Sequence, residues 1–128
     1  MDQRTEGILL IALMIALSLV FQVQMKMFAS TLGPLLAKAQ DWRGMVGALL
    51  ATSFGWRGLF IAALACLLLL LWLLALTRLE LSFALPLASI AFVITAVGGG
   101  FWLGEDLSWM RVLGLIATAV GIGLVVYS

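Results

Sequence analysis

Apolar residues gather in four long segments along the chain, separated by shorter polar stretches. A helix needs about 20 apolar residues to cross the hydrocarbon core of a bilayer, and the four segments reach this length over residues 8–28, 58–77, 83–103 and 108–127. The second and third are uncharged, whereas the first holds Lys26 near its end and the fourth holds Arg111 near its start. The pattern predicts an all-α integral membrane protein, a four-transmembrane-helix bundle forming a single domain over residues 1–128.

The connection between the first two segments is long and partly apolar. After Gly33 and Pro34, hydrophobic residues recur at the helical spacings of three and four, at Leu35, Leu36, Ala39, Trp42, Met45, Val46, Leu49 and Leu50. Charged residues fall between them, so residues 35–50 are predicted to form an interfacial amphipathic helix between the first and second spans. The other two connections are only a few residues long, which makes consecutive helices antiparallel neighbours.

The first segment has a second interpretation, a secretory signal peptide. It is too long for one, its preceding region is weakly basic, and it ends in Gln and Lys rather than in small residues. We therefore interpret it as a retained helix.

The basic residues are divided unequally between the two membrane sides. One side holds two, Arg4 and Arg78, and the other holds five, Lys26, Lys38, Arg43, Arg57 and Arg111. The positive-inside rule then favours both termini outside the cytoplasm.

Composition narrows the possible classes of function. Hydrophobic residues make up 65% of the chain and charged residues 10%, whereas about a quarter of a soluble domain is charged. There is no histidine and a single cysteine, Cys66, so we expect no internal disulfide, metal site or cofactor. The net charge of +1 gives no reason to expect nucleic acid as a partner. No catalytic triad or phosphate-binding loop is present, so we do not expect an enzyme.

Polar side chains form a row on one face of the first helix. Ser18, Gln22 and Lys26 recur at a spacing of four, which places them on the same side of a helix. A polar row within an apolar helix is expected to face protein or water, so these are candidate substrate-binding residues, with Lys26 as the cation that meets an anion. Two structural roles stay open for Lys26: it snorkels to the headgroups, or it pairs with Glu105 or Asp106.

Pro86 interrupts the third helix. Proline removes a backbone hydrogen bond and predicts a kink. Ser89 lies on the same helix face as Pro86. Because transporters place substrate at broken helices, Ser89 is a further candidate substrate-binding residue.

Gly98–Gly100 make the later part of this helix thin, either for pliability or for tight packing. Glu105 and Asp106 directly precede the fourth helix. Acidic residues are favoured at the positive end of a helix dipole, which accounts for both of them.

Small residues share a broad face of the fourth helix. Gly114, Thr118 and Gly121 allow a second helix to approach closely, either within the chain or between two chains. We favour a dimer, because four helices alone enclose little space for a bulky substrate.

Two arginines, Arg57 and Arg111, lie on the same membrane side as Lys26. They are candidates for attracting an anionic headgroup, and interfacial anchoring is the alternative role.

Two short motifs lie at the two ends of the third helix: residues 79–87 read LELSFALPL and residues 104–108 read GEDLS, ahead of a glycine-rich last helix. With these motifs the stretch from Leu76 to Val126 resembles the small four-helix members of the drug/metabolite transporter superfamily. In that superfamily the third helix often begins with an "lsxAyPl" segment and the last connection reads "GExls". Leu85 replaces the usual aromatic residue.

Two branches of the superfamily are candidates. Small multidrug exporters carry a glutamate in the middle of the first helix, but residues 8–28 have no acidic residue. The subunits that flip aminoarabinose-phosphoundecaprenol across the bacterial inner membrane have a Gln followed four residues later by a Lys, a spacing that Gln22 and Lys26 match.

The second resemblance implies a flippase subunit that acts on a polyprenyl-phosphate-linked sugar among membrane lipids. It also implies a homodimer, or a heterodimer with a similar small subunit. An exporter of organic cations and a non-transporting accessory subunit of a larger complex remain alternatives.

Overall fold

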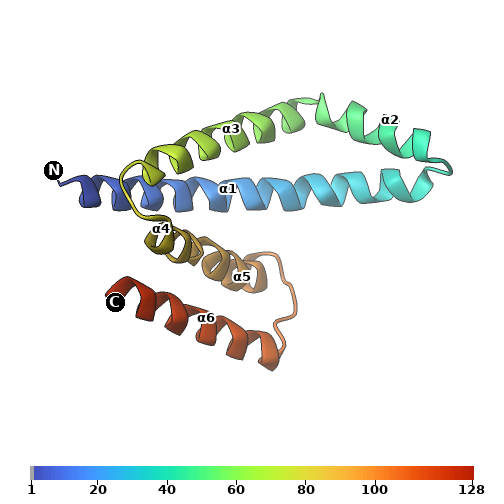
Figure 1. The fold of residues 1–128 in the computed structure, drawn as a ribbon. Helices are drawn as coiled ribbons and strands as arrows, with labels where there is room; N and C mark the ends of the chain where they lie inside the picture. The colour runs from blue at the N-terminus through green and yellow to red at the C-terminus, as the bar shows by residue number, and fades with distance from the viewer. Residues whose placement is uncertain (1) are drawn as a thin grey trace.

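All regular structure in the computed structural model, which describes residues 2–128, is helical (Figure 1). The helices are α1 (Gln3–Lys38), α2 (Trp42–Ser53), α3 (Trp56–Leu76), α4 (Leu81–Ala88), α5 (Ile90–Trp102) and α6 (Trp109–Tyr127). Four helical segments are long and apolar enough to cross a membrane: α1, α3, α4 with α5, and α6. The all-α membrane fold predicted from the hydrophobic pattern is confirmed.

Helix α1 is the centre of the arrangement. It packs against α3 on one side and against α4 and α5 on the other, while α6 contacts only α4 and α5 among the described helices (Figure 1). The buried core lies where three helices meet and consists of Ile11, Met14, Leu71, Ala75 and Ala84. Most other large apolar side chains are exposed, as expected for helices whose outer faces meet lipid.

The start of α1 is held against the α3–α4 connection. Arg78 Nη1 lies 3.2 Å from Glu6 Oε2, and Arg4 lies over the ring of Phe83, 5.2 Å from its centroid. Gly7 is buried, and a Cβ added there would lie 2.6 Å from Leu79 Cγ. The two chain termini and this connection therefore lie at one end of the molecule (Figure 1).

Helix α1 is much longer than the predicted first span. Its 36 residues extend about 54 Å at 1.5 Å per residue, whereas the hydrocarbon core is about 30 Å thick. Pro34 lies inside the helix without ending it, and the chain turns only after Lys38, where Ala39 is extended. The segment predicted as one amphipathic helix from Leu35 to Leu50 is thus divided between the end of α1 and the separate helix α2.

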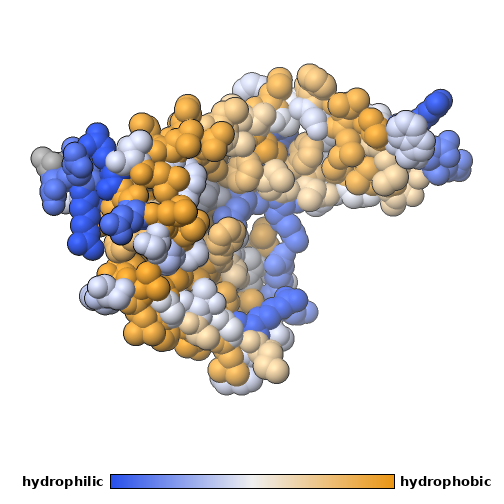
Figure 2. All heavy atoms as spheres, in the orientation of Figure 1, coloured by the Kyte–Doolittle hydropathy of each residue, from blue (hydrophilic) through white to orange (hydrophobic). Residues whose placement is uncertain are grey.

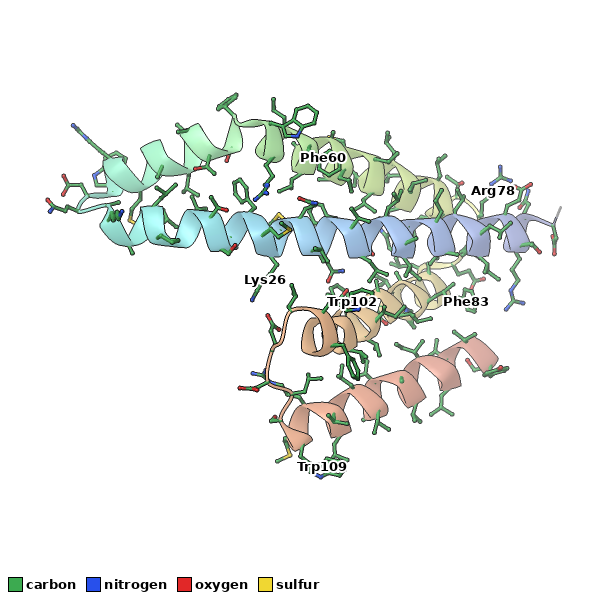
Figure 3. The ribbon with its side chains drawn as sticks, turned by 180° about the vertical axis from the view of Figure 1, so that it is seen from behind. Lys26, Phe60, Arg78, Phe83, Trp102 and Trp109 are labelled. Carbon is green, nitrogen blue, oxygen red and sulfur yellow. The ribbon has the colours of Figure 1, made fainter. Side chains whose placement is uncertain are left out.

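Helix α2 runs back along the last turns of α1, and α3 continues in the same direction after a bend (Figure 1). Because α3 is antiparallel to α1, the start of α3 returns to the level of Lys26, and the labelled Phe60 lies near that level (Figure 3). The last turns of α1 and all of α2 therefore project beyond α4–α6. Figure 2 shows hydrophilic residues gathered at this projecting end and at the opposite end. The surface between the two ends is mostly hydrophobic, with a further hydrophilic group below the projecting part.

Gly58 permits the bend between α2 and α3. A Cβ added to it would overlap the backbone of Ser53, approaching the carbonyl carbon to 2.6 Å and the carbonyl oxygen still more closely. Backbone cannot rotate out of the way as a side chain can, so any larger residue must open the bend.

We expect Gly58→Ala to lower the free energy of unfolding by about 1–3 kcal/mol, the usual cost of overpacking. Gly47→Ala is the matched control, because its added Cβ meets nothing within 4 Å, and alanine in place of glycine within a helix stabilises by about 0.5–1 kcal/mol. Denaturant unfolding in detergent micelles compares them. Equal stability of the two variants would contradict the role given to Gly58.

The third span is divided into α4 and α5 at Ser89, three residues after Pro86. Proline supplies no N–H to the carbonyl one turn earlier. Ser89 Oγ donates a hydrogen bond of 2.6 Å to Pro86 O, which satisfies a backbone acceptor where the helix is interrupted. The break lies between two rigid segments of the same span.

Candidate functional site

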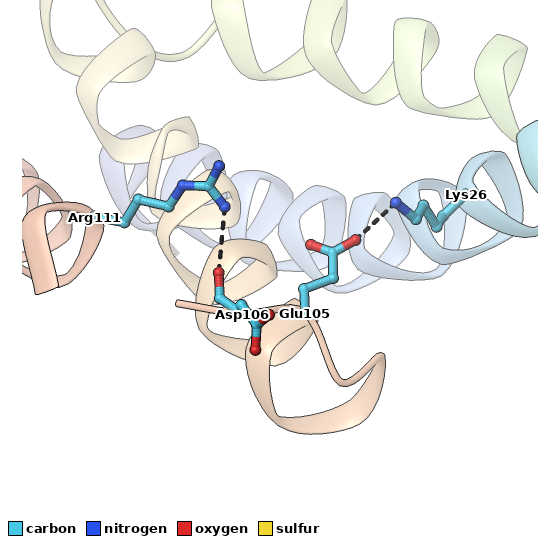
Figure 4. Close-up of polar contacts among 4 residues, drawn as sticks. All are labelled: Lys26, Glu105, Asp106 and Arg111. Atoms are coloured by element: carbon cyan, nitrogen blue, oxygen red, sulfur yellow. Dashed lines mark hydrogen bonds and ion pairs between the residues drawn. The ribbon is translucent and has the colours of Figure 1, made fainter. Parts of the chain in front are cut away.

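An ion pair joins the middle of α1 to the connection between α5 and α6. Lys26 Nζ lies 2.7 Å from Glu105 Oε1 (Figure 4), and Lys26 extends from α1 toward this connection (Figure 3). The pair is one of the two roles that the sequence left open for Lys26. Both side chains remain accessible, with 58% of Lys26 and 44% of Glu105 exposed.

The ion pair lies at one end of a cavity of about 740 Å³ between α1 and α5. Gln22 and Lys26 of α1 face it, together with Thr95 of α5 and Glu105. The rest of the wall is almost entirely apolar and includes Leu19, Phe21, Val23, Met25, Phe92, Ile94, Trp102 and Leu103. This combination of apolar walls with a few polar groups, at this volume, is typical of ligand-binding pockets.

Two glycines set the position of Glu105. Gly99 O accepts hydrogen bonds from Leu103 N (3.2 Å) and Glu105 N (3.3 Å), which fold the chain back over the end of α5. Gly104 adopts φ +66°, a conformation that favours glycine. A Cβ added to Gly99 would lie 3.3 Å from Glu105 Oε2. Gly99 thus lets the carboxylate of Glu105 pack closely against α5, and Gly100 in the same way makes room for the side chain of Leu107.

Lys26 also controls the ionisation of Glu105. Its hydrogen bond and then its positive charge lower the pKa of the Glu105 carboxyl, with Arg111 adding a smaller lowering and burial opposing it. A depressed pKa means that the pair contributes fully above the ordinary pKa of 4.5 and is lost only as the pH falls through the lowered value.

We expect the Glu105 carboxyl to stay ionised below pH 4.5 and Lys26→Gln to raise its pKa toward the ordinary value, because the largest stabilising contacts of the carboxylate are then gone. Infrared or NMR titration of isotope-labelled glutamate in micelles measures this. Lys38→Gln, which removes a charge at the far end of α1, should leave the titration in place. A Glu105 titration insensitive to Lys26→Gln would disprove the pairing in solution.

The remaining candidates from the sequence lie outside the cavity wall. Ser18 Oγ donates to Ile15 O at 2.8 Å, and the Ser89 hydroxyl is bonded within its own helix break. Arg57 is the second residue of α3, a helix that lies across α1 from α5 (Figure 1). Arg111 lines an adjoining pocket of about 650 Å³ that also includes Glu105, and its Nη1 donates to Asp106 O at 3.4 Å (Figure 4). Their roles as ligands stay predictions.

The small-residue face of α6 is exposed, and Gly114 and Thr118 line a pocket of about 350 Å³ together with Ala96 of α5. Gly114 and Gly121 are exposed, and an added Cβ at either would meet nothing within 4 Å. Thr118 Oγ1 donates to Gly114 O at 2.8 Å, so its hydroxyl is satisfied within α6. Packing of this face against a second chain stays a prediction.

Sequence reasoning missed the contribution of Glu105 to this cavity. Its place ahead of α6 suggested interaction with the helix dipole, yet Ser108 already caps that helix by accepting from Arg111 N at 3.4 Å. Thr95 and Trp102 were also missed, because neutral residues on an apolar helix give no signal of their own. Within residues 2–128 no group of three or more His, Cys, Asp or Glu side chains is arranged to hold a metal ion.

The four apolar helices define a small multi-pass membrane protein. Between two of them, α1 and α5, lies a cavity whose mostly apolar wall includes the charged residues Lys26 and Glu105. Over 53 residues the chain is 40% identical to a probable 4-amino-4-deoxy-L-arabinose-phosphoundecaprenol flippase subunit, ArnF, of Shewanella sediminis. The similarity covers 40% of this chain and 37% of that protein, so it extends over well under two thirds of the relative. No family model matches the chain, and no solved structure matches it.

Proposed function

We propose that the chain is a subunit of a membrane flippase or transporter that moves a polyprenyl-phosphate-linked sugar, of the aminoarabinose-phosphoundecaprenol type, between leaflets. The observation that carries this proposal is the cavity between α1 and α5, in which Lys26 supplies a positive charge at the end of an apolar wall. The partial similarity to a flippase subunit supports the same class of protein.

The chemistry of such a substrate matches the two parts of the cavity. A lipid-linked sugar phosphate has an anionic headgroup and a long apolar tail. In this proposal Lys26 and Gln22, which both line the cavity, bind the headgroup: Lys26 meets the phosphate and Gln22 hydrogen-bonds phosphate or sugar. The apolar wall accommodates the first part of the tail. Arg111, in the adjoining pocket, is placed to attract the headgroup. Movement between leaflets forms and breaks no covalent bond, so a catalytic group is not required.

Assembly with a second small chain is part of this proposal. The open face of α6 at Gly114, Thr118 and Gly121 allows close approach of another helix. A dimer, formed with a second copy or with a similar small subunit, would enclose the substrate more fully than α1 and α5 alone. The location proposed is the bacterial inner membrane.

Native mass spectrometry of the protein in mild detergent tests the proposal, followed by fragmentation of any lipid that stays bound. We expect a dimer that carries a polyprenyl phosphate or its sugar conjugate. Recovery of bulk phospholipid alone, in a preparation supplied with the polyprenyl conjugate, would count against the proposed substrate. Stoichiometric recovery of a larger membrane protein would instead favour an accessory subunit.

A further inference from the structure

The Lys26–Glu105 ion pair can be separated at little cost in stability. Both side chains are substantially exposed, and an exposed ion pair adds little to stability because water screens it. The charges come from two separate elements, α1 and the α5–α6 connection, and they meet inside the cavity wall. A ligand that separates them therefore loses little protein stability and gains two charged groups a short distance apart.

The kind of ligand follows from counting charges. A simple anion would occupy Lys26 but leave Glu105 unpaired beside it, and a simple cation would leave Lys26 unpaired. A headgroup that carries both charges replaces one internal ion pair by two. Charge-assisted hydrogen bonds to ammonium and to phosphate are among the stronger polar contacts available, so such a ligand is favoured over either single charge.

We infer that the opened pair binds a zwitterionic lipid headgroup, with Lys26 holding a phosphate and Glu105 holding an ammonium group. This rests on the proposed function and deepens it, because it makes Glu105 the residue that recognises an amine on the transported lipid. The same chemistry occurs in a lipid-linked aminosugar phosphate and in an aminophospholipid, and the experiment below separates these sources.

Two features of the cavity support this division of roles. The backbone bonds to Gly99 O and the positive φ of Gly104 fix the chain at Glu105, so the carboxylate has a defined position for an amine. Gln22, one helical turn before Lys26 on the same cavity wall, supplies a neutral amide that can bond hydroxyl groups of the headgroup. The apolar wall leaves room for the lipid chain.

The test measures binding of water-soluble short-chain probes to the purified full chain in nanodiscs. The probes are farnesyl phosphate, its aminoarabinose diester and the same diester with the amine acetylated. We expect the wild-type protein to bind the free-amine diester about tenfold more tightly than the acetylated one, the effect of one charged hydrogen bond. Glu105→Gln should remove that preference and bind farnesyl phosphate at least as tightly as wild type, since Lys26 loses its internal competitor.

Asp106→Asn is the matched control. Asp106 adjoins Glu105 in the chain but its side chain enters neither ion pair within residues 2–128, so this variant should keep the wild-type preference for the amine. Circular dichroism and hydrodynamic radius establish that both variants remain folded. Equal weakening of all three probes by Glu105→Gln would overturn the inference, because it would show a structural effect of the loop.

The two proposals fail in different ways. Wild-type binding of the two diesters without discrimination overturns the role of Glu105 and leaves the flippase proposal standing. Failure of the wild type to bind any polyprenyl probe overturns the proposed substrate. In that case, enrichment of phosphatidylethanolamine over phosphatidylglycerol around the wild type, lost in Glu105→Gln, supports the zwitterion inference with an aminophospholipid as ligand. Absence of that enrichment overturns the inference as well.

Discussion

Lys26→Ala is expected to abolish transport of a polyprenyl-phosphate-linked sugar. The variant removes the positive charge at the end of the cavity and leaves Glu105 facing the phosphate without its counter-ion. Loss of a charged hydrogen bond alone lowers a rate by at least about tenfold, and repulsion by Glu105 adds to this. Uptake of a short-chain lipid-linked sugar into proteoliposomes measures the initial rate.

Two further variants make this experiment specific. Lys38→Ala removes a lysine from the same helix but beyond the cavity, and it should transport at the wild-type rate. Lys26→Arg keeps the charge and should retain part of the activity. The variants are compared at equal amounts of inserted protein. Transport by Lys26→Ala at the wild-type rate would remove Lys26 from the mechanism.

Ile11→Ala is expected to lower the free energy of unfolding substantially. Ile11 is fully buried where α1 meets α3 and α4. Lipid is about as apolar as the protein interior, so the cost comes mainly from the cavity and from lost packing contacts, at about 2 kcal/mol. Leu13→Ala, on the same helix but 51% exposed, should cost much less. Unfolding in mixed micelles compares the two variants. An equal loss of stability would show that Ile11 does not belong to the buried core.

The sequence was sufficient for the spanning helices because long uncharged runs have no other stable place than a bilayer. It was insufficient for the length of α1. Pro34 suggested a boundary, yet the residues that follow it, Leu35 to Lys38, are good helix formers. The helix therefore tolerates the missing hydrogen bond, and its actual end lies at Lys38. The Pro86 segment shows the opposite outcome, since there the helix is divided at Ser89.

Only the part of the candidate site that α1 contributes could be predicted from the sequence. Spacing along one helix places Gln22 and Lys26 on a common face, and both line the cavity. Whether Lys26 meets a headgroup or an acidic residue depends on how α5 and its following loop return to α1, which no local pattern specifies. The fold of that loop rests on Gly99 and Gly104, and from the sequence alone Gly99 is explained equally well by helix packing.

The level of Lys26 along α1 has a consequence for sidedness. Lys26 lies level with the start of α3, where Trp56 and Arg57 stand, and such residues favour the edge of the hydrocarbon region. A binding group at that height meets lipids of one leaflet and is about one membrane thickness from the other. Under the proposed function, oriented vesicles should therefore load from a single face, and release at the opposite face would require movement of the helices rather than a fixed path through them.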